Sequence, residues 1–247
     1  MTAEPGTLYL VSTPIGNLED MTFRAVSVLK SVSLIAAEDT RNSGILLSHY
    51  QIATAVISLH DHNERNRTAS VLTRLQAGDS VALISDAGTP LISDPGYFLV
   101  REAIRNSIRV EAIPGASALL TALVSSGLAC DQFYFVGFLP QKKGRRSRLQ
   151  SLSTIQGTLV FYESPFRIHS LIEDCLEIYG NRQAVLTREL TKKFETIYRG
   201  DLQSLKTSLS GQSLKGEMVL LVEGLTRHLR QDDDHDQPDP LYSVPRP

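Results

Sequence analysis

Five segments that follow short apolar runs concentrate Ser, Thr, Asp, His, Gly and Pro, the residue types that bind ligands or move protons. In chain order they are residues 12–20 (STPIGNLED), 37–41 (AEDTR), 60–64 (HDHNE), 85–90 (SDAGTP) and 114–117 (PGAS). Each apolar run predicts a strand, and open parallel sheets bind ligands beyond the carboxyl ends of their strands. We therefore expect these segments to meet at one ligand site.

The stretch SDAGTPLISDPG, residues 85–96, contains the pair Ser-Asp twice. Asp86 directly follows the apolar run VALI, so we expect it to face the ligand site, in a loop shaped by Gly88 and Pro90. Asp94 precedes Pro95 and a helical pattern, which is the arrangement of an N-cap and first turn. The sequence thus predicts that Asp86 binds a ligand and that Asp94 only starts a helix.

The elements of the first half alternate between strands and helices. Predicted strands cover residues 7–12, 33–38, 55–60, 80–85 and 109–114, and predicted helices cover 22–31, 63–77, 95–106 and 116–127. The strands are apolar almost throughout, as expected for parallel strands covered on both faces. This pattern predicts an α/β fold with a mostly parallel sheet and helices on both of its faces.

The second half has a different rhythm. Five β-rich runs, at residues 133–138, 158–164, 183–190, 194–200 and 218–224, are separated by only one clear helix, at 165–180. Hairpins and a mixed α/β sheet are therefore expected. We place an N-terminal domain at 1–128, a C-terminal domain at 129–227, and an acidic, Pro-rich tail at 228–247 that we expect to be disordered.

Composition excludes several classes of protein. No run approaches the roughly 18 to 20 apolar residues of a membrane span, and the N-terminus lacks the pattern of a secretion signal. We therefore expect a cytoplasmic protein with no membrane contact. Cys130 and Cys175 stand apart without metal-ligand spacing, so we expect buried thiols and no metal.

The common nucleotide and hydrolase motifs are missing as well. The sequence contains neither GxGxxG after the first strand nor GxxxxGK[ST], which argues against NAD, FAD and ATP. Ser117 in GASAL lacks the second Gly of a nucleophile elbow. Loops rich in Gly and Pro between two α/β domains still suit a small ligand held largely by backbone groups.

Charge is spread unevenly over a chain whose net charge is −2. The tail carries five aspartates against two arginines, whereas residues 142–148 (KKGRRSR) place five cations in seven positions. Such a cluster is typical either of a solvated loop or of a local phosphate-binding patch. Composition by itself favours the solvated loop.

Eight segments, in this order, resemble the ribosomal RNA small-subunit methyltransferase I group of the tetrapyrrole methylase superfamily. They are STPIGNLEDMTFRAVSVLKSVSLIAAEDTR, HDHNE, SDAGTPLISDPG, IPGASA, GFLP, FYESPFRI, TRELTKKFETIYRG and GEMVLLVEG, within residues 7–224. The resemblance implies a tetrapyrrole-methylase-like two-domain fold and an enzyme, a methyltransferase using S-adenosylmethionine. It further implies 2′-O-methylation of a cytidine ribose in the decoding region of 16S rRNA, and a homodimer.

The resemblance also implies a set of cofactor-binding residues in the cleft between the domains. They are Ile15 in the first loop, Ile84, Ser85, Asp86 and Thr89 in the second, Ser117 and Ala118 in the Pro-Gly loop, and Tyr162, Glu163, Glu189 and Glu223 from the second domain. Ordinary packing remains an alternative role for Ile15, Ile84 and Ala118.

The predicted RNA contacts follow from one departure from the family pattern. The group usually continues past VEG with a basic helical segment, whereas this chain runs into the acidic tail. The cations of the 142–148 run are then the best remaining phosphate contacts, namely Lys142, Lys143, Arg145, Arg146 and Arg148. Arg41, a permanently charged fork, is a further candidate. The expected partner is 16S rRNA or the assembled small ribosomal subunit.

The proposed reaction needs a base for the ribose hydroxyl proton. Aligning two reactants supplies roughly 7 to 11 kcal/mol, whereas a general base contributes about 10²- to 10⁴-fold. Candidates are Glu38, Asp39 and His60, with Glu163 and Glu189 as others; Asp39 could instead cap a helix, and His60 could bond a strand end. Two other functions stay open: C-methylation of a tetrapyrrole precursor, and a non-catalytic RNA-binding or ribosome-assembly module.

Overall fold

The first half of the chain folds into a five-stranded parallel sheet. The computed structural model describes residues 3–141 and 143–225. The strands β1 (Thr7–Val11), β2 (Leu34–Ala37), β3 (Val56–Ser58), β4 (Val81–Ile84) and β5 (Arg109–Ile113) lie in the order β3-β2-β4-β1-β5. Every pair is parallel, so the predicted parallel sheet is confirmed.

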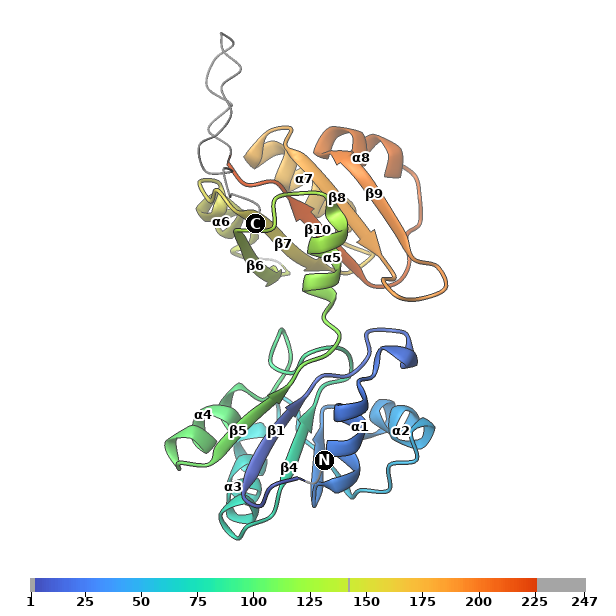
Figure 1. Cartoon of the computed structure of the whole chain (residues 1–247). Helices are drawn as coiled ribbons and strands as arrows, with labels where there is room; N and C mark the ends of the chain where they lie inside the picture. The colour runs from blue at the N-terminus through green and yellow to red at the C-terminus, as the bar shows by residue number, and fades with distance from the viewer. Residues whose placement is uncertain (1–2, 142, 226–247) are drawn as a thin grey trace, which may run out of the picture.

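Helices cover both faces of this sheet (Figure 1). On one face lie α1 (Phe23–Ser31) and α2 (Thr40–His49), and on the other α3 (Glu64–Gln76) and α4 (Tyr97–Arg105). The core splits accordingly, with Leu29 and Leu47 in one cluster and Val71 and Leu99 in the other. A short 3-10 turn, Leu18–Asp20, precedes α1. The sequence pattern gave no range for α2, whose polar residues hide its periodicity, although Asp39 was considered as the cap of a helix there.

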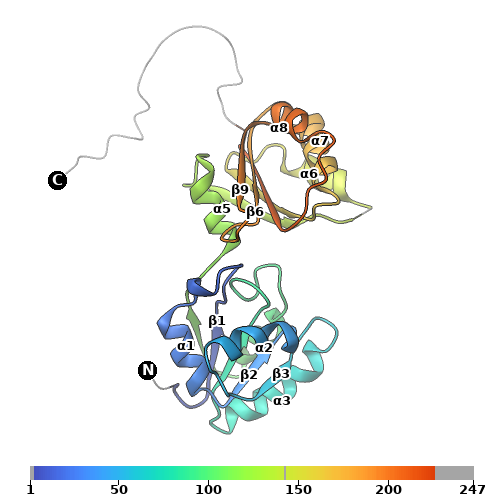
Figure 2. The ribbon, with the colours of Figure 1, turned by 90° about the vertical axis from the view of Figure 1, so that its right-hand side faces the viewer.

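The second half forms a mixed sheet. The strands β6 (Phe133–Phe138), β7 (Thr158–Glu163), β8 (Gln183–Arg188), β9 (Thr196–Asp201) and β10 (Met218–Val222) lie in the order β6-β7-β10-β8-β9. Only β6 and β7 pair in parallel, which confirms the mixed sheet. The helices α6 (Arg145–Leu152), α7 (Ile168–Tyr179) and α8 (Leu202–Leu209) cover one face (Figure 2).

Helix α5 (Ala118–Ser126) covers the opposite face of the second sheet. Its Leu119 and Leu123 pack in one cluster with Val160 and Val219. The sequence analysis assigned this segment to the N-terminal domain, because it continues the βα rhythm. We therefore propose that the domain boundary lies in the loop 114–117 instead of at 128 and 129. The predicted tail lies outside the described residues.

Two local predictions prove wrong. Asp94 does not cap α4; Gly96 is the N-cap, and the Glu64 carboxylate of α3 accepts hydrogen bonds from the N–H groups of Phe98 and Leu99 at 2.8 and 3.2 Å. A neighbouring helix thus satisfies the donors that Asp94 was expected to bind. Cys175 is buried as predicted, but Cys130 is exposed.

Candidate functional site

A cavity of about 370 Å³ lies between the carboxyl edge of the first sheet and the second sheet. This volume falls in the range of small-molecule sites, which are mostly apolar with a few converging polar groups. Six of the predicted cofactor residues line it: Ile15, Thr89, Ser117, Ala118, Tyr162 and Glu163. The lining also contains residues that the sequence analysis missed, among them Ile92, Ser93, Asp94, Phe138, Leu190 and Glu217.

Three loops of the first sheet are tied together at the rim of the cavity. The Thr89 hydroxyl lies 3.1 Å from the Ser12 hydroxyl and donates to the Ala116 carbonyl at 3.2 Å. Thr13 and Gly88 exchange two backbone hydrogen bonds, at 2.8 and 3.0 Å. Loops that are far apart in sequence therefore form one rigid edge. The polar segments that follow the predicted strands were expected to meet at such an edge.

The second loop contributes less to the cavity than predicted. Ile84 and Ser85 are buried in the body of the first sheet and do not line the cavity. Asp86 is exposed and also lies outside the lining; its carboxylate accepts from the Asp39 N–H at 3.1 Å and from the Asn42 amide at 2.7 Å. Asp86 therefore connects the β4 loop to the start of α2. This arrangement argues against a direct contact between Asp86 and the ligand.

The opposite wall comes from β6, β7 and β10. The ring of Tyr162 meets the rings of Phe135 and Phe138 edge-on, at centroid distances of 5.0 and 5.6 Å. Burial raises the pKa of Tyr162 to about 12, so its hydroxyl stays neutral in the physiological range. This wall offers a ligand apolar faces and one hydroxyl.

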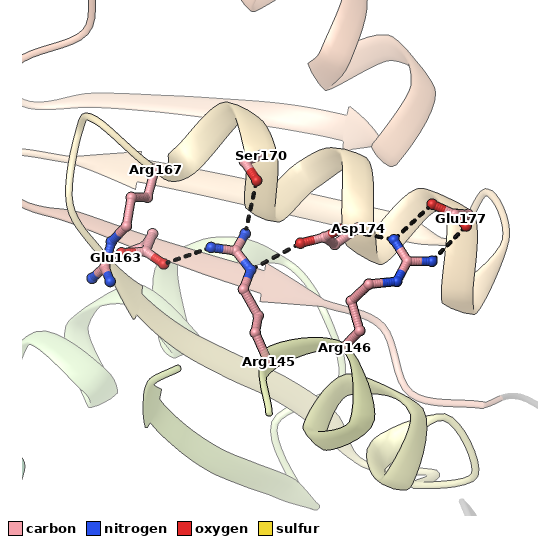
Figure 3. A network of polar contacts seen from close by, with 7 residues as sticks. All are labelled: Arg145, Arg146, Glu163, Arg167, Ser170, Asp174 and Glu177. Carbon is pink, nitrogen blue, oxygen red and sulfur yellow. Dashed lines mark hydrogen bonds and ion pairs between the residues drawn. The ribbon is translucent and has the colours of Figure 1, made fainter. Parts of the chain in front are cut away.

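Glu163 ends β7 and is held by cations (Figure 3). Its Oε1 lies 2.7 Å from Arg167 Nη2, and its Oε2 lies 3.8 Å from Arg145 Nη1. Arg145 also pairs with Asp174 at 2.8 Å, and Asp174 pairs in turn with Arg146 at 3.2 Å. The network joins α6 and α7 to the cavity wall.

Glu189 supports the wall from behind. Its carboxylate accepts from the Glu217 N–H at 2.9 Å and from Lys192 Nζ at 3.0 Å, and these bonds lower its pKa, the Glu217 N–H most. Gly216 has a φ of +91°, and a Cβ there would lie 2.4 Å from this carboxylate. Glu189 thus fixes the loop that carries Glu217 into the cavity. It was predicted to contact the cofactor itself.

Glu223 lies at the wrong end of its strand to reach the cavity. The cavity is lined by Met218 and Val219, at the start of β10. Glu223 follows the other end of that strand, where its N–H donates to the Gln183 carbonyl at 2.9 Å. The strand therefore places Glu223 away from the cavity lining, which argues against the predicted cofactor contact.

The three predicted bases surround the carboxyl edge of the first sheet without lining the cavity. Asp39 caps α2, and its hydrogen bonds to Arg41 lower its pKa to about 2, which makes it a poor base. Burial, with the charge of Asp86 second, raises the pKa of Glu38. The Nε2 of His60 lies 3.1 Å from the Asn63 amide. Each of these residues has a structural role or a position away from the cavity.

The basic run divides into structural and exposed cations. Arg145 is buried in the network described above and is not a phosphate contact. Arg146 pairs with Asp174 and with Glu177, at 2.9 Å for the second. Lys143 is exposed, Arg148 lies over the Tyr134 ring, and Arg41 is 88% exposed. Lys142 lies outside the described residues.

Residues 3–141 and 143–225 contain no group of three or more His, Cys, Asp or Glu side chains placed to bind a metal ion. In the same ranges, no helix combines the length and apolar character that crossing a membrane requires.

Comparison with known proteins identifies the class of this chain. The family model of Tetrapyrrole (Corrin/Porphyrin) Methylases matches residues 7–206. The solved structure of a diphthine synthase covers 88% of this chain and 89% of its own, with a TM-score of 0.68 and 13% identity. A uroporphyrin-III C-methyltransferase from Thermus thermophilus, solved with S-adenosyl homocysteine, gives a TM-score of 0.62 at 17% identity, covering 87% of this chain and 96% of its own. The chain belongs to the tetrapyrrole methylase family.

Relatives of higher sequence identity identify the group within this family. A protein of Streptococcus pyogenes named ribosomal RNA small subunit methyltransferase I is 52% identical over 220 residues, which are 89% of this chain and 77% of that protein. A protein of the same name from Pasteurella multocida is 49% identical over 243 residues, covering 97% of this chain and 85% of the relative. These relatives confirm the group that the eight segments predicted.

Proposed function

We propose that this protein uses S-adenosylmethionine to methylate small-subunit ribosomal RNA, at the 2′-hydroxyl of a cytidine ribose in the decoding region. The observation that carries the proposal is the cavity between the two sheets, lined by six of the residues that the family motifs marked. The name shared by the relatives at about half identity supports RNA as the acceptor. The uroporphyrin enzymes, at 17–20% identity, share the fold alone.

The lining residues fit S-adenosylmethionine. Ile15, Leu190 and Val219 offer aliphatic surface to its ring system, while hydroxyl and carboxylate groups remain for its polar ends. The buried Oε2 of Glu163 has no hydrogen-bond partner among the described residues and faces Arg145 Nη1 at 3.8 Å. S-adenosylmethionine supplies, when bound, a methyl group on a sulfonium that an oxygen nucleophile can accept.

The chain itself contributes mainly alignment. The bonds that join Ser12, Thr89 and Ala116 hold the three loops in one arrangement, and the Glu163 network holds the facing wall. Two rigid walls keep donor and acceptor at a fixed separation, and alignment of this kind supplies roughly 7 to 11 kcal/mol. The apolar lining excludes water, which strengthens the remaining polar contacts.

RNA contacts are proposed for the exposed cations. Arg41 begins α2 beside the carboxyl edge of the first sheet, and Lys143 and Arg148 lie at the start of α6. A guanidinium or ammonium that neutralises a phosphate releases counterions, so these contacts weaken with salt. Arg145 and Arg146 are left out, because carboxylates of α7 occupy them.

A homodimer is part of the proposal. Leu120 and Val124, one turn apart on α5, are 51% and 74% exposed. An apolar pair on the outer face of a helix favours contact with a second surface. Sedimentation of the purified protein tests it: a dimer that Val124→Asp converts to a monomer supports the proposal, and a monomeric wild type contradicts it.

Labelled methyl transfer tests the activity. Purified protein is incubated with methyl-labelled S-adenosylmethionine and small subunits that lack ribose methylation, and the nucleosides are separated by mass spectrometry. We expect label in 2′-O-methylcytidine only. Label in a base, or transfer to a tetrapyrrole and not to RNA, would contradict the proposed acceptor.

A further inference from the structure

The loop between β4 and α4 brings a carboxylate into the cavity. Ile92, Ser93 and Asp94 all line it, and the loop rises from the first sheet toward the second (Figure 1). Leu91 and Ser93 have left-handed backbones, with φ of +72° and +71°. Such conformations are unfavourable for residues other than Gly, and they cluster at functional sites.

The fold leaves the Asp94 carboxylate available. The first N–H groups of α4 are bound by Glu64 instead. Among residues 3–141 and 143–225, no cation pairs with Asp94. Glu163, across the same cavity, pairs with two guanidinium groups. Of these two cavity carboxylates, Asp94 is the one that no cation holds.

The groups that face Asp94 come from its own loop and from three other elements. Glu38 follows β2, Asp61 lies between β3 and α3, Ser85 and Asp86 follow β4, and Tyr162 lies across the cavity on β7. Burial raises the pKa of Asp94 to about 6, the charges of Glu38, Asp86 and Asp61 add to the rise, and the Ser85 hydroxyl opposes it. A base with a pKa near the working pH transfers protons efficiently.

We propose that Asp94 is the general base of the methyl transfer. The inference rests on the proposed function. As the ribose oxygen forms its bond to the methyl carbon, the bond from that carbon to sulfur breaks and leaves its electron pair on sulfur. The O–H bond of the ribose breaks in the same event, and its proton passes to the Asp94 carboxylate.

Single-turnover methyl transfer by Asp94→Asn tests the proposal. We expect the rate constant to fall by about 10²- to 10⁴-fold, with the affinity for S-adenosylmethionine, measured by calorimetry, unchanged. In the wild type the rate falls about tenfold per pH unit below the Asp94 pKa of about 6. The residual rate of Asp94→Asn has no such acid limb.

A matched variant, Asp61→Asn, removes a neighbouring carboxylate outside the cavity. It keeps the wild-type rate at pH 8 and moves the acid limb to lower pH, because one charge that raises the Asp94 pKa is gone. An unchanged rate in Asp94→Asn overturns the proposal. So does a loss of rate matched by an equal loss of cofactor affinity, which would make Asp94 a binding residue. A wild type that transfers no methyl to RNA refutes the proposed function instead.

Discussion

Asp94 and Glu163 face one cavity from two walls, and their surroundings are opposite. Glu163 ends a strand, is 2% exposed, and is held by Arg167 and Arg145. Asp94 lies on a loop with left-handed residues, beside other carboxylates. Two environments give two carboxylates different roles. Glu163 is held by two cations and fixes a wall, and Asp94 is free to take a proton.

The comparison also separates stability from activity within the site. The wall of the second sheet is supported by a charge network in which Glu163 and Arg145 are buried and paired, and such pairs are costly to disrupt. The loop of the first sheet holds strain and an unpaired carboxylate, which reduce stability. Removing a charge from the paired network is therefore expected to lower the free energy of unfolding, whereas removing the Asp94 charge is expected to raise it.

The largest expected effect is on the paired side. Arg145→Ala removes a buried cation and leaves Glu163 with Arg167 alone and Asp174 with Arg146 alone. Breaking a buried pair in this way costs about 3 to 5 kcal/mol of unfolding free energy. Urea denaturation measures it. The control is Arg148→Ala, an exposed cation over Tyr134, with an expected loss below about 1 kcal/mol. Equal small losses in both would show that the network is not structural.

The next largest effect is expected from a substitution that disturbs the backbone of the Asp94 loop. Gly96 has a φ of +122°, and an added Cβ would lie 2.5 Å from Leu83 Cδ2. Gly96→Ala should therefore lower the unfolding free energy by about 1 to 3 kcal/mol. At Gly44, inside α2, a Cβ meets nothing within 4 Å, and Gly44→Ala should stabilise by about 0.4 to 1 kcal/mol. A change of the same sign in the unfolding free energy of both variants would contradict the loop geometry.

Removing the unpaired charge of Asp94 is expected to raise the free energy of unfolding. The Asp94 pKa is about 6 in the folded state and roughly 3.9 in the unfolded chain. Between these values the folded protein binds more protons, so wild-type stability falls as pH rises through this window. Asp94→Asn has no such loss. Its unfolding free energy relative to the wild type should be higher at pH 8 than at pH 5, and a pH-independent difference would count against a raised pKa.

The smallest expected effect concerns Arg41, an exposed cation beside the carboxyl edge of the first sheet that is proposed to contact RNA. Arg41 is bonded only to its neighbour Asp39 among the described residues. If Arg41 contacts a phosphate, Arg41→Ala lowers the salt slope of RNA binding by about 1 while leaving stability unchanged. Filter binding across salt concentrations measures the slope. Arg24→Ala, on α1, is the control, and equal slopes in both variants would exclude the contact.

Sequence patterns predicted the framework of the site better than its chemistry. Apolar runs fixed the parallel and mixed sheets, and the clustering of Gly, Pro and Ser at strand ends located the rim. The structure places Asp94, and not Asp86, in the cavity lining, and this placement depends on two tertiary contacts. Glu64 reaches α4 from another helix, and Asn42 holds Asp86 from α2. No local pattern contains those contacts, although the second Ser-Asp pair marked the loop.

The phosphate contacts predicted for residues 142–148 also depended on contacts with residues that are distant in sequence. KKGRRSR has the composition of a phosphate-binding loop, yet its Arg145 and Arg146 begin a helix that packs against α7. Their partners, Asp174 and Glu177, lie some thirty residues away in sequence. Composition cannot tell a solvated cation from one that is neutralised by a distant carboxylate.

Calorimetry of S-adenosylmethionine binding tests the central claim, that the cavity between the sheets holds the methyl donor. Ala118 lines the cavity at the start of α5, so Ala118→Trp fills it. Ala69→Trp, on the exposed side of α3, is the control. We predict binding by the wild type and the control, and an affinity at least about tenfold lower for Ala118→Trp, a difference of about 1.4 kcal/mol. Equal affinity in all three proteins would contradict the account.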